Sequence, residues 1–484
     1  MSFNIYAQSI TIQPGTNTDP AMIRIENQAS SNKPRSIELP VVNTEERQKM
    51  TNIKTGTTVF DKDSRQTFTF LELSSSEKYW VGSNQILQVP NAIFPSPATN
   101  NIGFGNAGDL AIFFDQVNGG DFKYFLAVAA PNDAANKGAV FIFKLNGSTT
   151  SSYNQVAKIT ASDGVAGDEF GTSVAMSNGY LVVGAPKHNG ARGASYVFKV
   201  TAQGPNAFLW TETTKLTRPS AAVNDLFGSD VKIFSYPYYL TGNPAVIAVT
   251  SPGDDLTSPA VTDIGSVAVF TENTTNNWVL TQVIKDVSGV NGEGIGMKLD
   301  MENFNTIGWA KNTSPTTAKV TTVRNNGSFL YANPSTVNLT EKIFDFDMPQ
   351  DASSNNITTS FAVGMLNKAQ TYNHDNATNT WSLKYTVTPS GFVGTNFGYG
   401  VRLNVSGTGL LVRDYQNQFV ASYADVGSTQ LRLSNRTYFT AFNSNNFPKG
   451  CMIFKNGFLF LGDGNSSSTS PGRVFGLNTQ FSFD

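Results

Sequence analysis

Residues 157–198 read AKITASDGVAGDEFGTSVAMSNGYLVVGAPKHNGARGASYVF. Three apolar strand candidates in this stretch are separated by residues that favour turns. Ser177-Asn178-Gly179 lies between the first two, and a polar, glycine-rich run precedes the third. Because Asn-Gly favours a tight two-residue hairpin, the stretch predicts one antiparallel meander.

The same stretch resembles the FG-GAP repeat of integrin-type β-propellers, in which Phe-Gly opens an inner strand and Gly-Ala-Pro closes the next. Phe170-Gly171 and Gly184-Ala185-Pro186 stand at these places. A phenyl ring at Phe170 can fill the space between neighbouring blades, and Gly171 lets backbones approach closely. Pro186 ends a strand where no amide donor is required. We therefore interpret the motif as part of the fold and not as a ligand site.

Further copies of the motif are expected, because a lone blade cannot bury both of its faces. They recur as Phe104-Gly105 with Pro131, Phe227-Gly228 with Pro252, and Phe397-Gly398. Gly294–Met297 stands where another Phe-Gly is expected, and three tryptophans mark outer strands, namely Trp210, Trp278 and Trp381. The pattern predicts an all-β fold with about seven four-stranded antiparallel blades over residues 98–484.

Composition excludes several classes of protein. Charged residues make up 14% of the 484 residues, whereas Phe occurs 35 times and Gly 42 times, which favours short strands joined by turns. The formal net charge is −2 and no basic run occurs, so we expect no nucleic-acid partner. We expect no membrane insertion, because no run of eighteen apolar residues exists, and the N-terminal residues carry no readable export signal.

The reactive side chains argue against catalysis. Cys451 is the only cysteine, which excludes an internal disulfide and a zinc cluster of several cysteines. The two histidines, His188 and His374, lie in segments that read as exposed turns. Nothing resembles a Gly-x-Ser-x-Gly nucleophile elbow. We therefore predict a protein without catalytic residues or cofactors.

The resemblance makes calcium a candidate ligand, because the family often binds this ion in a loop of alternating acids. The corresponding hairpin here, Ser177-Asn178-Gly179, is too short and uncharged to hold it. Asp163 and Asp168 flank the loop before Phe170, but two acids are more simply turn and cap residues. We predict no obligatory calcium and no metal site.

The N-terminal segment divides into an extended arm (1–36), a small module (37–82) and a linker (83–97). A capping-box-like start predicts a short helix over 43–50, and 52–61 with 66–72 reads as a hairpin. The module resembles one found in tail-fibre and related surface proteins of phages and other viruses, with Leu-Pro, an arginine-containing helix, Gly-x-x-Val-Tyr and a terminal Trp in that order. The matching residues are Leu39, Pro40, Arg47, Gly56, Val59 and Trp80.

This second resemblance departs from its pattern at two points. Phe60 replaces the usual Tyr, and Ser74-Ser75-Ser76 lengthens the connection to the tryptophan. The resemblance implies an exposed, assembled context in which the module attaches the chain to other proteins. Bacterial surface proteins also carry such modules, so both origins stay open.

Three functions follow as hypotheses. The first is a virion structural protein (fibre, spike or capsid-associated) at the particle surface, oligomeric in its assembly. Its N-terminal module docks to other virion or fibre proteins, and its propeller binds a host protein or glycan receptor. The second is a bacterial cell-surface adhesin with the same division of labour. The third, an enzyme on a propeller scaffold, is disfavoured by the scarcity of histidine and of acid clusters.

Overall fold

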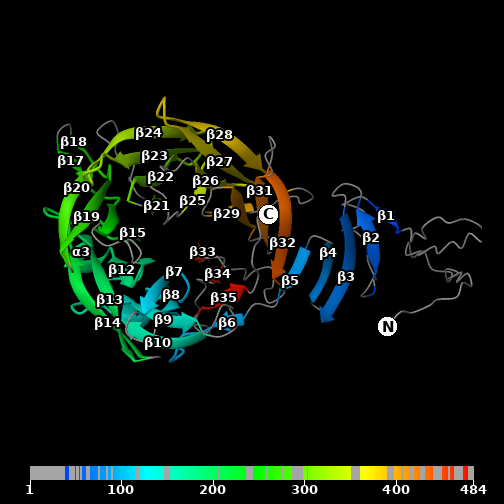
Figure 1. Cartoon of the computed structure of the whole chain (residues 1–484), viewed down its shortest axis with the longest axis horizontal. Coiled ribbons are helices and arrows are strands. Elements are labelled where there is room, and N and C mark those ends of the chain that lie inside the picture. Colours follow the sequence, from blue (N-terminus) through cyan, green and yellow to red (C-terminus); the bar gives the residue numbers. More distant parts are fainter. Residues whose placement is uncertain are drawn as a thin grey trace, which may run out of the picture.

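A computed structural model shows the chain as a ring of seven blades with a small sheet beside it (Figure 1). It describes residues 39–42, 50, 54, 57–61, 66–74, 77–82, 85–88, 91–115, 120–145, 153–204, 207–235, 244–257, 260–274, 276–285, 298–301, 304–349, 360–389, 397–404, 408–414, 419–425, 431–439, 450–455, 458–462 and 472–477. The prediction of an all-β, seven-bladed propeller is confirmed.

Each blade is an antiparallel sheet whose first strand lies at the inside of the ring. The first three blades contain β7 (Gly108–Asp115), β8 (Asp121–Ala130), β9 (Ala139–Leu145) and β10 (Tyr153–Ile159); β11 (Ser173–Ser177), β12 (Tyr180–Ala185), β13 (Ala194–Gly204) and β14 (Ala207–Leu216); β15 (Val231–Phe234), β16 (Val246–Ser251), β19 (Ser266–Thr274) and β20 (Asn277–Ile284). A short hairpin, β17 (Leu256–Thr257) with β18 (Ala260–Val261), extends from the third blade.

Blades four to seven follow in chain order. They contain β21 (Lys298–Met301), β22 (Thr306–Ser314), β23 (Thr317–Asn325) and β24 (Tyr331–Leu339); β25 (Ile343–Asp347), β26 (Ser360–Met365), β27 (Lys368–Asp375) and β28 (Thr380–Val387); β29 (Phe397–Leu403), β30 (Gly409–Asp414), β31 (Phe419–Asp425) and β32 (Leu431–Phe439); β33 (Met452–Lys455), β34 (Phe458–Gly462) and β35 (Val474–Leu477). The degenerate motif at 294–297 lies outside the described residues.

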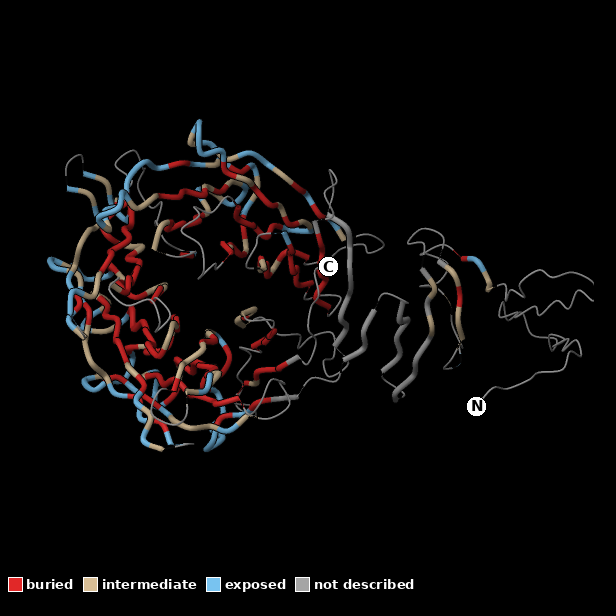
Figure 2. Tube along the Cα trace, viewed as in Figure 1, coloured by how far each residue is buried: buried red, intermediate tan, exposed pale blue. Residues whose placement is uncertain are grey.

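Burial follows the position of a strand within its blade. Every residue of the second strands β12, β16 and β26 is buried, because each has a neighbouring blade on both faces. The fourth strands are less buried, and β14 and β20 begin with exposed and buried residues in alternation, so that Trp210 on β14 and Trp278 on β20 are buried. Figure 2 shows buried chain in the middle of the blades and exposed chain at the outer rim. The apolar core is therefore divided among the seams between blades.

The ring is closed by a strand from near the N-terminus. β6 (Asn91–Ile93) pairs antiparallel with β35 and completes the last blade, while β5 (Gln85–Gln88) adds a fifth, parallel strand to the sixth blade beside β32. Residues 83–97 were expected to be a linker, and this expectation is wrong. Their short strands carry no local signal, because their partners lie at the other end of the chain.

The N-terminal module contains a four-stranded sheet of β1 (Val41–Val42), β2 (Thr58–Asp61), β3 (Gln66–Ser74) and β4 (Glu77–Gly82). The predicted hairpin is present as β2 with β3. The predicted helix at 43–50 falls almost entirely outside the described residues, as does the arm 1–36. In Figure 1 the sheet stands beside β5 and β32 at the edge of the ring, and β4 contacts β5.

Candidate functional site: motif seams and the central channel

The Phe-Gly residues form the seams between blades. Phe104, Phe170, Phe227 and Phe397 are fully buried. Three of them form isolated bridges with a glycine of the preceding blade: Phe104 with Gly472, Phe170 with Gly138, and Phe227 with Gly193. These backbones leave no room for a side chain, since a Cβ on Gly138 would lie 2.0 Å from the Phe170 carbonyl oxygen.

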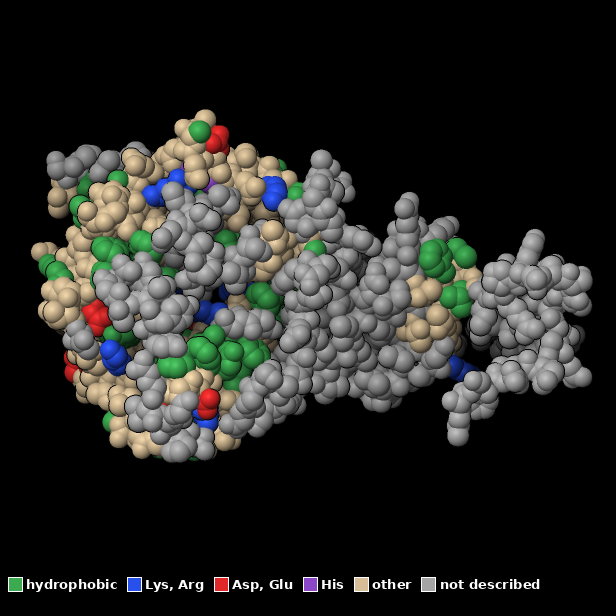
Figure 3. Space-filling view, viewed as in Figure 1, with side chains coloured by type: hydrophobic (Ala, Val, Ile, Leu, Met, Phe, Trp, Pro, Cys, Tyr) green, Lys and Arg blue, Asp and Glu red, His purple; other side chains and the backbone are tan. Residues whose placement is uncertain are grey.

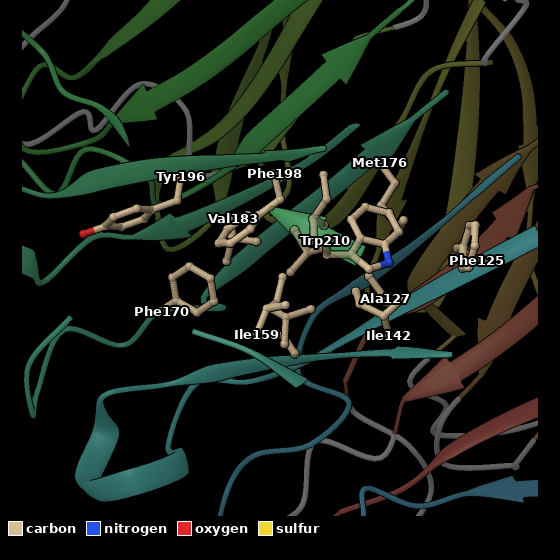
Figure 4. Close-up of a cluster of buried hydrophobic side chains, with 14 of the residues drawn as sticks. Phe125, Ala127, Ile142, Ile159, Phe170, Met176, Val183, Tyr196, Phe198 and Trp210 are labelled. Carbon is tan, nitrogen blue, oxygen red and sulfur yellow. The ribbon is translucent and has the colours of Figure 1, made fainter. Parts of the chain in front are cut away.

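The seam between the first two blades is seen in Figure 4. The Phe170 ring meets Tyr196 and Phe198 edge-on, with ring centroids 5.6 and 6.0 Å apart. Ile142 and Ile159 of the first blade lie in the same cluster. The glycine that follows each of the four phenylalanines has a positive φ, for example +92° at Gly105. The motif thus joins blades and leaves no opening for a ligand at these residues.

The other residues predicted from the sequence lie at the ends of second strands and in the N-terminal module. Gly184, Ala185, Pro186 and Pro131 are buried at the ends of second strands, and Pro252 is half-buried. In the N-terminal module Val59 is buried, Leu39 and Pro40 are half-buried, and Trp80 lies on β4. Arg47 and Gly56 lie outside the described residues. The structure therefore brings Val59 and Trp80 into one sheet.

Charged side chains that were not predicted from the sequence line the inside of the ring. The innermost strands, together with Asp230 directly before β15, carry carboxylates and cations in nearly equal number: Asp109, Asp230, Asp300, Asp345 and Asp347 with Lys232, Lys298, Arg402 and Lys455. Figure 3 shows a hollow at the centre of the ring with basic side chains at its edge. We call these nine residues the channel lining.

Ion pairs in the channel lining join different blades. Lys455 Nζ lies 3.3 Å from Asp109 Oδ2 and donates to the Met176 carbonyl at 3.1 Å, so that one side chain links the seventh, first and second blades. Lys232 Nζ is 3.5 Å from Asp300 Oδ1. Arg402 Nη1 is 2.6 Å from Asp345 Oδ2, and Arg402 Nε is 3.6 Å from Asp347 Oδ1.

The carboxylates also accept backbone hydrogen bonds from the next blade. Asp109 accepts from the Met176 N–H at 2.7 Å, and Asp300 accepts from the Met348 N–H at 2.7 Å. Asp347 accepts from the Leu403 N–H at 2.7 Å. These contacts satisfy inner-strand amide groups that have no further strand to pair with. Part of the lining is therefore structural.

The charged groups of the channel lining also shift one another's pKa values. Burial lowers the pKa of Lys232, but Asp300, Asp230 and Asp109 outweigh this and raise it above its ordinary value. Burial raises the pKa of Asp230, and burial together with the nearby Asp300 raises the pKa of Asp347 to about 8. Burial also acts to raise the pKa of Asp345, but Arg402 and Lys298 hold it below its ordinary value.

This arrangement offers hydrogen-bond donors and acceptors of both signs at one place. Among the described residues, no three His, Cys, Asp or Glu side chains gather as a metal site would require. Because its donors and acceptors carry both signs, the lining suits a polar ligand rather than an apolar one.

No helix in the described part of the chain has the length and apolar character to span a membrane.

A sequence signal for the lining did exist. The first strands of blades three to five read VKIF, KLDM and IFDFD, in which charged residues interrupt strongly apolar strands. In a strand whose other face is apolar, this alternation indicates a second face that carries the charged side chains. It was hidden because each interruption is a single residue in a separate repeat.

The two histidines were expected in exposed turns; His188 does lie in a turn-like segment after β12, but neither side chain is exposed. The His188 side chain is 12% exposed, and His374 lies on β27 and is 7% exposed. His374 Nδ1 is 2.6 Å from Arg324 Nη2, and its ring meets Trp381 edge-on. Burial, followed by the Arg324 charge, lowers the pKa of His374. The polar neighbours in sequence concealed packing partners from other strands.

Known proteins resemble this chain in fold and in one repeat. The family model described as FG-GAP repeat matches residues 153–198. No curated protein matches the chain in sequence. The chain is thus a seven-bladed β-propeller protein with one FG-GAP repeat, which runs from β10 of the first blade into β13 of the second.

Solved structures with a similar fold come from proteins of different kinds. A protein from Lactobacillus plantarum is 12% identical with a TM-score of 0.45, over 70% of this chain and 88% of that one. The Cps50 (Swd1) β-propeller domain of Myceliophteria thermophila is 10% identical with a TM-score of 0.45, over 81% and 100%. The periplasmic gluconolactonase of Pseudomonas aeruginosa is 14% identical with a TM-score of 0.42, over 77% and 92%. These likenesses concern the fold alone.

Proposed function

We propose that this chain is a non-enzymatic structural protein of a virus particle, a fibre, spike or capsid-associated component at the virion surface. Its N-terminal module, 37–82, attaches to other virion or fibre proteins, and its propeller is displayed to bind a host protein or glycan. The tail-fibre-like order of Leu39-Pro40, Val59 and Trp80 is the sequence feature behind this proposal.

The observation that carries the proposal is the division of the chain into two parts. The ring completes its own last blade with β6, so it does not use β1–β4 for closure. The sheet β1–β4 is separate, and its edge strand β1 has only two residues, with Val41 64% exposed. The edge of such a sheet presents unpaired backbone N–H and C=O groups, with which a strand of another chain can pair.

The attachment half of the proposal is tested with two truncations of the full chain. A chain lacking residues 1–82 keeps β5 and β6, so it is expected to fold but to be absent from purified particles by mass spectrometry. A chain lacking only 1–36 is the matched control and should still be incorporated. Incorporation of the shorter chain would move the docking surface to the propeller and overturn the proposal.

We expect the host protein or glycan to bind at the channel lining. Lys298 is exposed at the start of β21, and its charge reaches Asp230 and Asp345. Lys298→Ala in the 83–484 propeller is expected to weaken binding to host cells or arrayed glycans. Lys187→Ala, which removes a cation 54% exposed on an outer loop, should not. Equal binding by both variants would place the receptor site outside the channel.

The alternative, a bacterial cell-surface adhesin, has the same two-part architecture. Mass spectrometry of purified particles and of cell envelopes separates the two. Recovery of the chain only in envelopes would replace the first proposal with the second.

A further inference from the structure

The inner strands of blades five and six depart from the regular ladder of the other blades. β25 pairs with β26 with a register shift at Phe344, and β29 pairs with β30 with a shift that spans Tyr399. In the other five blades the described pairing of the first two strands runs without a shift. A bulge redirects a side chain and is common beside functional sites, so these two positions are set apart from the repeat.

The two bulges bring one aromatic ring from each blade into contact. Phe344 and Tyr399 stack with ring centroids 4.2 Å apart and an angle of 15° between the ring planes. Both residues are half-buried, and the described apolar clusters of blades five and six include neither of them. The pair is therefore a partly exposed aromatic surface outside the apolar core.

Two exposed lysines accompany the aromatic pair. Lys342 Nζ lies 5.9 Å from the centroid of the Phe344 ring, and Lys298 begins β21, the preceding inner strand. Neither lysine makes an ion pair with a residue that the structure describes. The other cations of the channel lining each have a carboxylate partner, namely Lys232, Arg402 and Lys455. The two exposed lysines are thus available to an anionic group.

The rings and the lysines lie at one mouth of the channel. Because four antiparallel strands bring the chain back to the face where each blade begins, all inner strands start at the same mouth. Lys298, Phe344 and Tyr399 lie at or next to the starts of β21, β25 and β29, which follow one another along the inside of the ring (Figure 1). We call Lys298, Lys342, Phe344 and Tyr399 the mouth site.

The charged groups beside the mouth site leave an excess of positive charge. Burial acts to raise the pKa of Asp345, but Arg402 and Lys298 hold it below its ordinary value, so Asp345 is an anion paired with Arg402. Burial raises the pKa of Asp347 to about 8, so at neutral pH this group is mostly uncharged. Two further carboxylates have lysines of their own: Asp300 with Lys232 at 3.5 Å and Glu341 with Lys368 at 2.5 Å.

This set of groups matches the chemistry of a sugar that carries a carboxylate. The apolar C–H face of a sugar ring can pack on aromatic rings, and an ammonium group binds a carboxylate through a charge-assisted hydrogen bond. The Glu341–Lys368 pair, with side chains 43% and 25% exposed, offers an acceptor and a donor for hydroxyl groups. An apolar ligand would leave the lysines unused, and a simple inorganic anion would leave the rings unused.

We propose that the mouth site binds an acidic sugar, a saccharide bearing a carboxylate, with its ring against Phe344 and Tyr399 and its carboxylate at Lys298. The inference rests on the proposed display of the propeller to a host receptor, and it names the chemical class of that receptor. The stacked rings also join blades five and six, but that structural role requires neither lysine.

Binding of the full chain to immobilised glycans tests the proposal. Glycans that contain sialic or uronic acids are compared with the same glycans after methyl esterification, which removes the charge of the carboxylate and keeps the sugar. The chain is expected to bind the acids and to bind the esters about tenfold more weakly or less. Equal binding to both forms, or binding to neither, overturns the proposal.

Variants of the full chain assign the binding to the mouth site. Lys298→Ala should weaken binding of the acids about tenfold and leave binding of the esters unchanged, which a merely structural role would not produce. Phe344→Ala should weaken both about tenfold, whereas Phe344→Tyr keeps the ring and should bind as the wild type does. Wild-type binding by Lys298→Ala or by folded Phe344→Ala overturns the proposal.

A matched control is available at the other end of the inner strands. Phe122 is 56% exposed in the β7–β8 hairpin and contacts Phe114, with ring centroids 5.1 Å apart. Phe122→Ala also removes one ring of an exposed aromatic pair, but it should not change binding. An equal loss of binding in Phe122→Ala and Phe344→Ala would overturn the assignment to the mouth site.

Host cells separate this inference from the proposed function. Enzymatic removal of acidic sugars from the cell surface is expected to abolish binding of the full chain. Binding that persists on the treated cells would overturn the inference and leave the proposed function in place, with a protein as the receptor. A chain that binds the acidic glycans but no host cell would contradict the proposed function while the inference stands.

Discussion

Ile93 and Val474 lie near opposite ends of the chain, yet they pair in the last blade and close the ring. Ala92 with Phe475 and Asn91 with Gly476 complete the contact. Ile93 is buried in the cluster that also holds Phe104 and Phe460, so the closing strand contributes core as well as hydrogen bonds. The ring is a closed unit because residues next to the predicted attachment module belong to it.

Ring closure predicts a sharp boundary for truncation. Removal of residues 1–82 should leave the melting temperature of the propeller unchanged, because β5 and β6 remain. Removal of 1–97 takes both strands and should lower it by about 5 °C or more. Differential scanning calorimetry of the two truncations measures this. Equal melting temperatures would mean that the last blade is stable without its outer strand.

The buried phenylalanine rings between blades predict that loss of the Phe170 side chain lowers the free energy of unfolding strongly. Phe170→Ala removes a fully buried ring between two blades and should lower the free energy of unfolding by about 3–5 kcal/mol. Leu209→Ala, at a position 52% exposed on β14, is the control and should change it by about 0.5 kcal/mol or less. Urea unfolding gives both values, and similar costs would contradict the role of the ring.

Alanine substitution at two glycines can distinguish the cost of an unfavourable φ from the cost of a steric clash. Gly138 and Gly167 have similar φ, +87° and +93°, but an added Cβ meets the Phe170 backbone at Gly138 and nothing within 4 Å at Gly167. Gly167→Ala should cost about 1–3 kcal/mol from the unfavourable φ alone. Gly138→Ala should cost more, since the two blades must move apart. Equal unfolding free energies would show that the seam tolerates separation.

Asp347 predicts a dependence of stability on pH. Burial raises its pKa to about 8 in the folded chain, above that of an unfolded aspartate. Its contribution to stability is therefore full below the pKa of an unfolded aspartate, about 4, and is lost progressively as pH rises from there to about 8. Asp347→Asn removes this loss, so the variant should gain stability relative to wild type as pH rises.

Urea unfolding at about pH 5 and about pH 9 measures this gain. Asp121→Asn, at a side chain 70% exposed, is the control and should show no such trend. A constant difference between Asp347→Asn and the wild type across this range would contradict the prediction.

Calcium removal tests the expectation that the propeller needs no ion. Thermal melts with and without a chelator should coincide within error, since stability is expected to come from the packing of blades. A drop of more than about 5 °C would reveal an ion site that the loop analysis did not predict.

The blades themselves were predictable from the sequence because a four-stranded meander is local. Phe170-Gly171, the Asn178-Gly179 turn and Trp210 lie within one repeat, and their spacing alone indicates strand, hairpin and outer strand. Repetition of the same pattern then predicts the ring, since each blade needs a neighbour on both faces.

Tertiary structure alone decided which distant residues meet. The pairing of Ile93 with Val474, the contact of Lys455 with Asp109 and the contact of His188 with Lys215 each join segments whose own sequences look like linker, strand or turn. Local propensity determines the strand, but the partner of a side chain depends on how seven blades fit around one axis. For that reason the sequence predicted the propeller, whereas its closing strand, its charged channel and the surroundings of its histidines had to be seen in three dimensions.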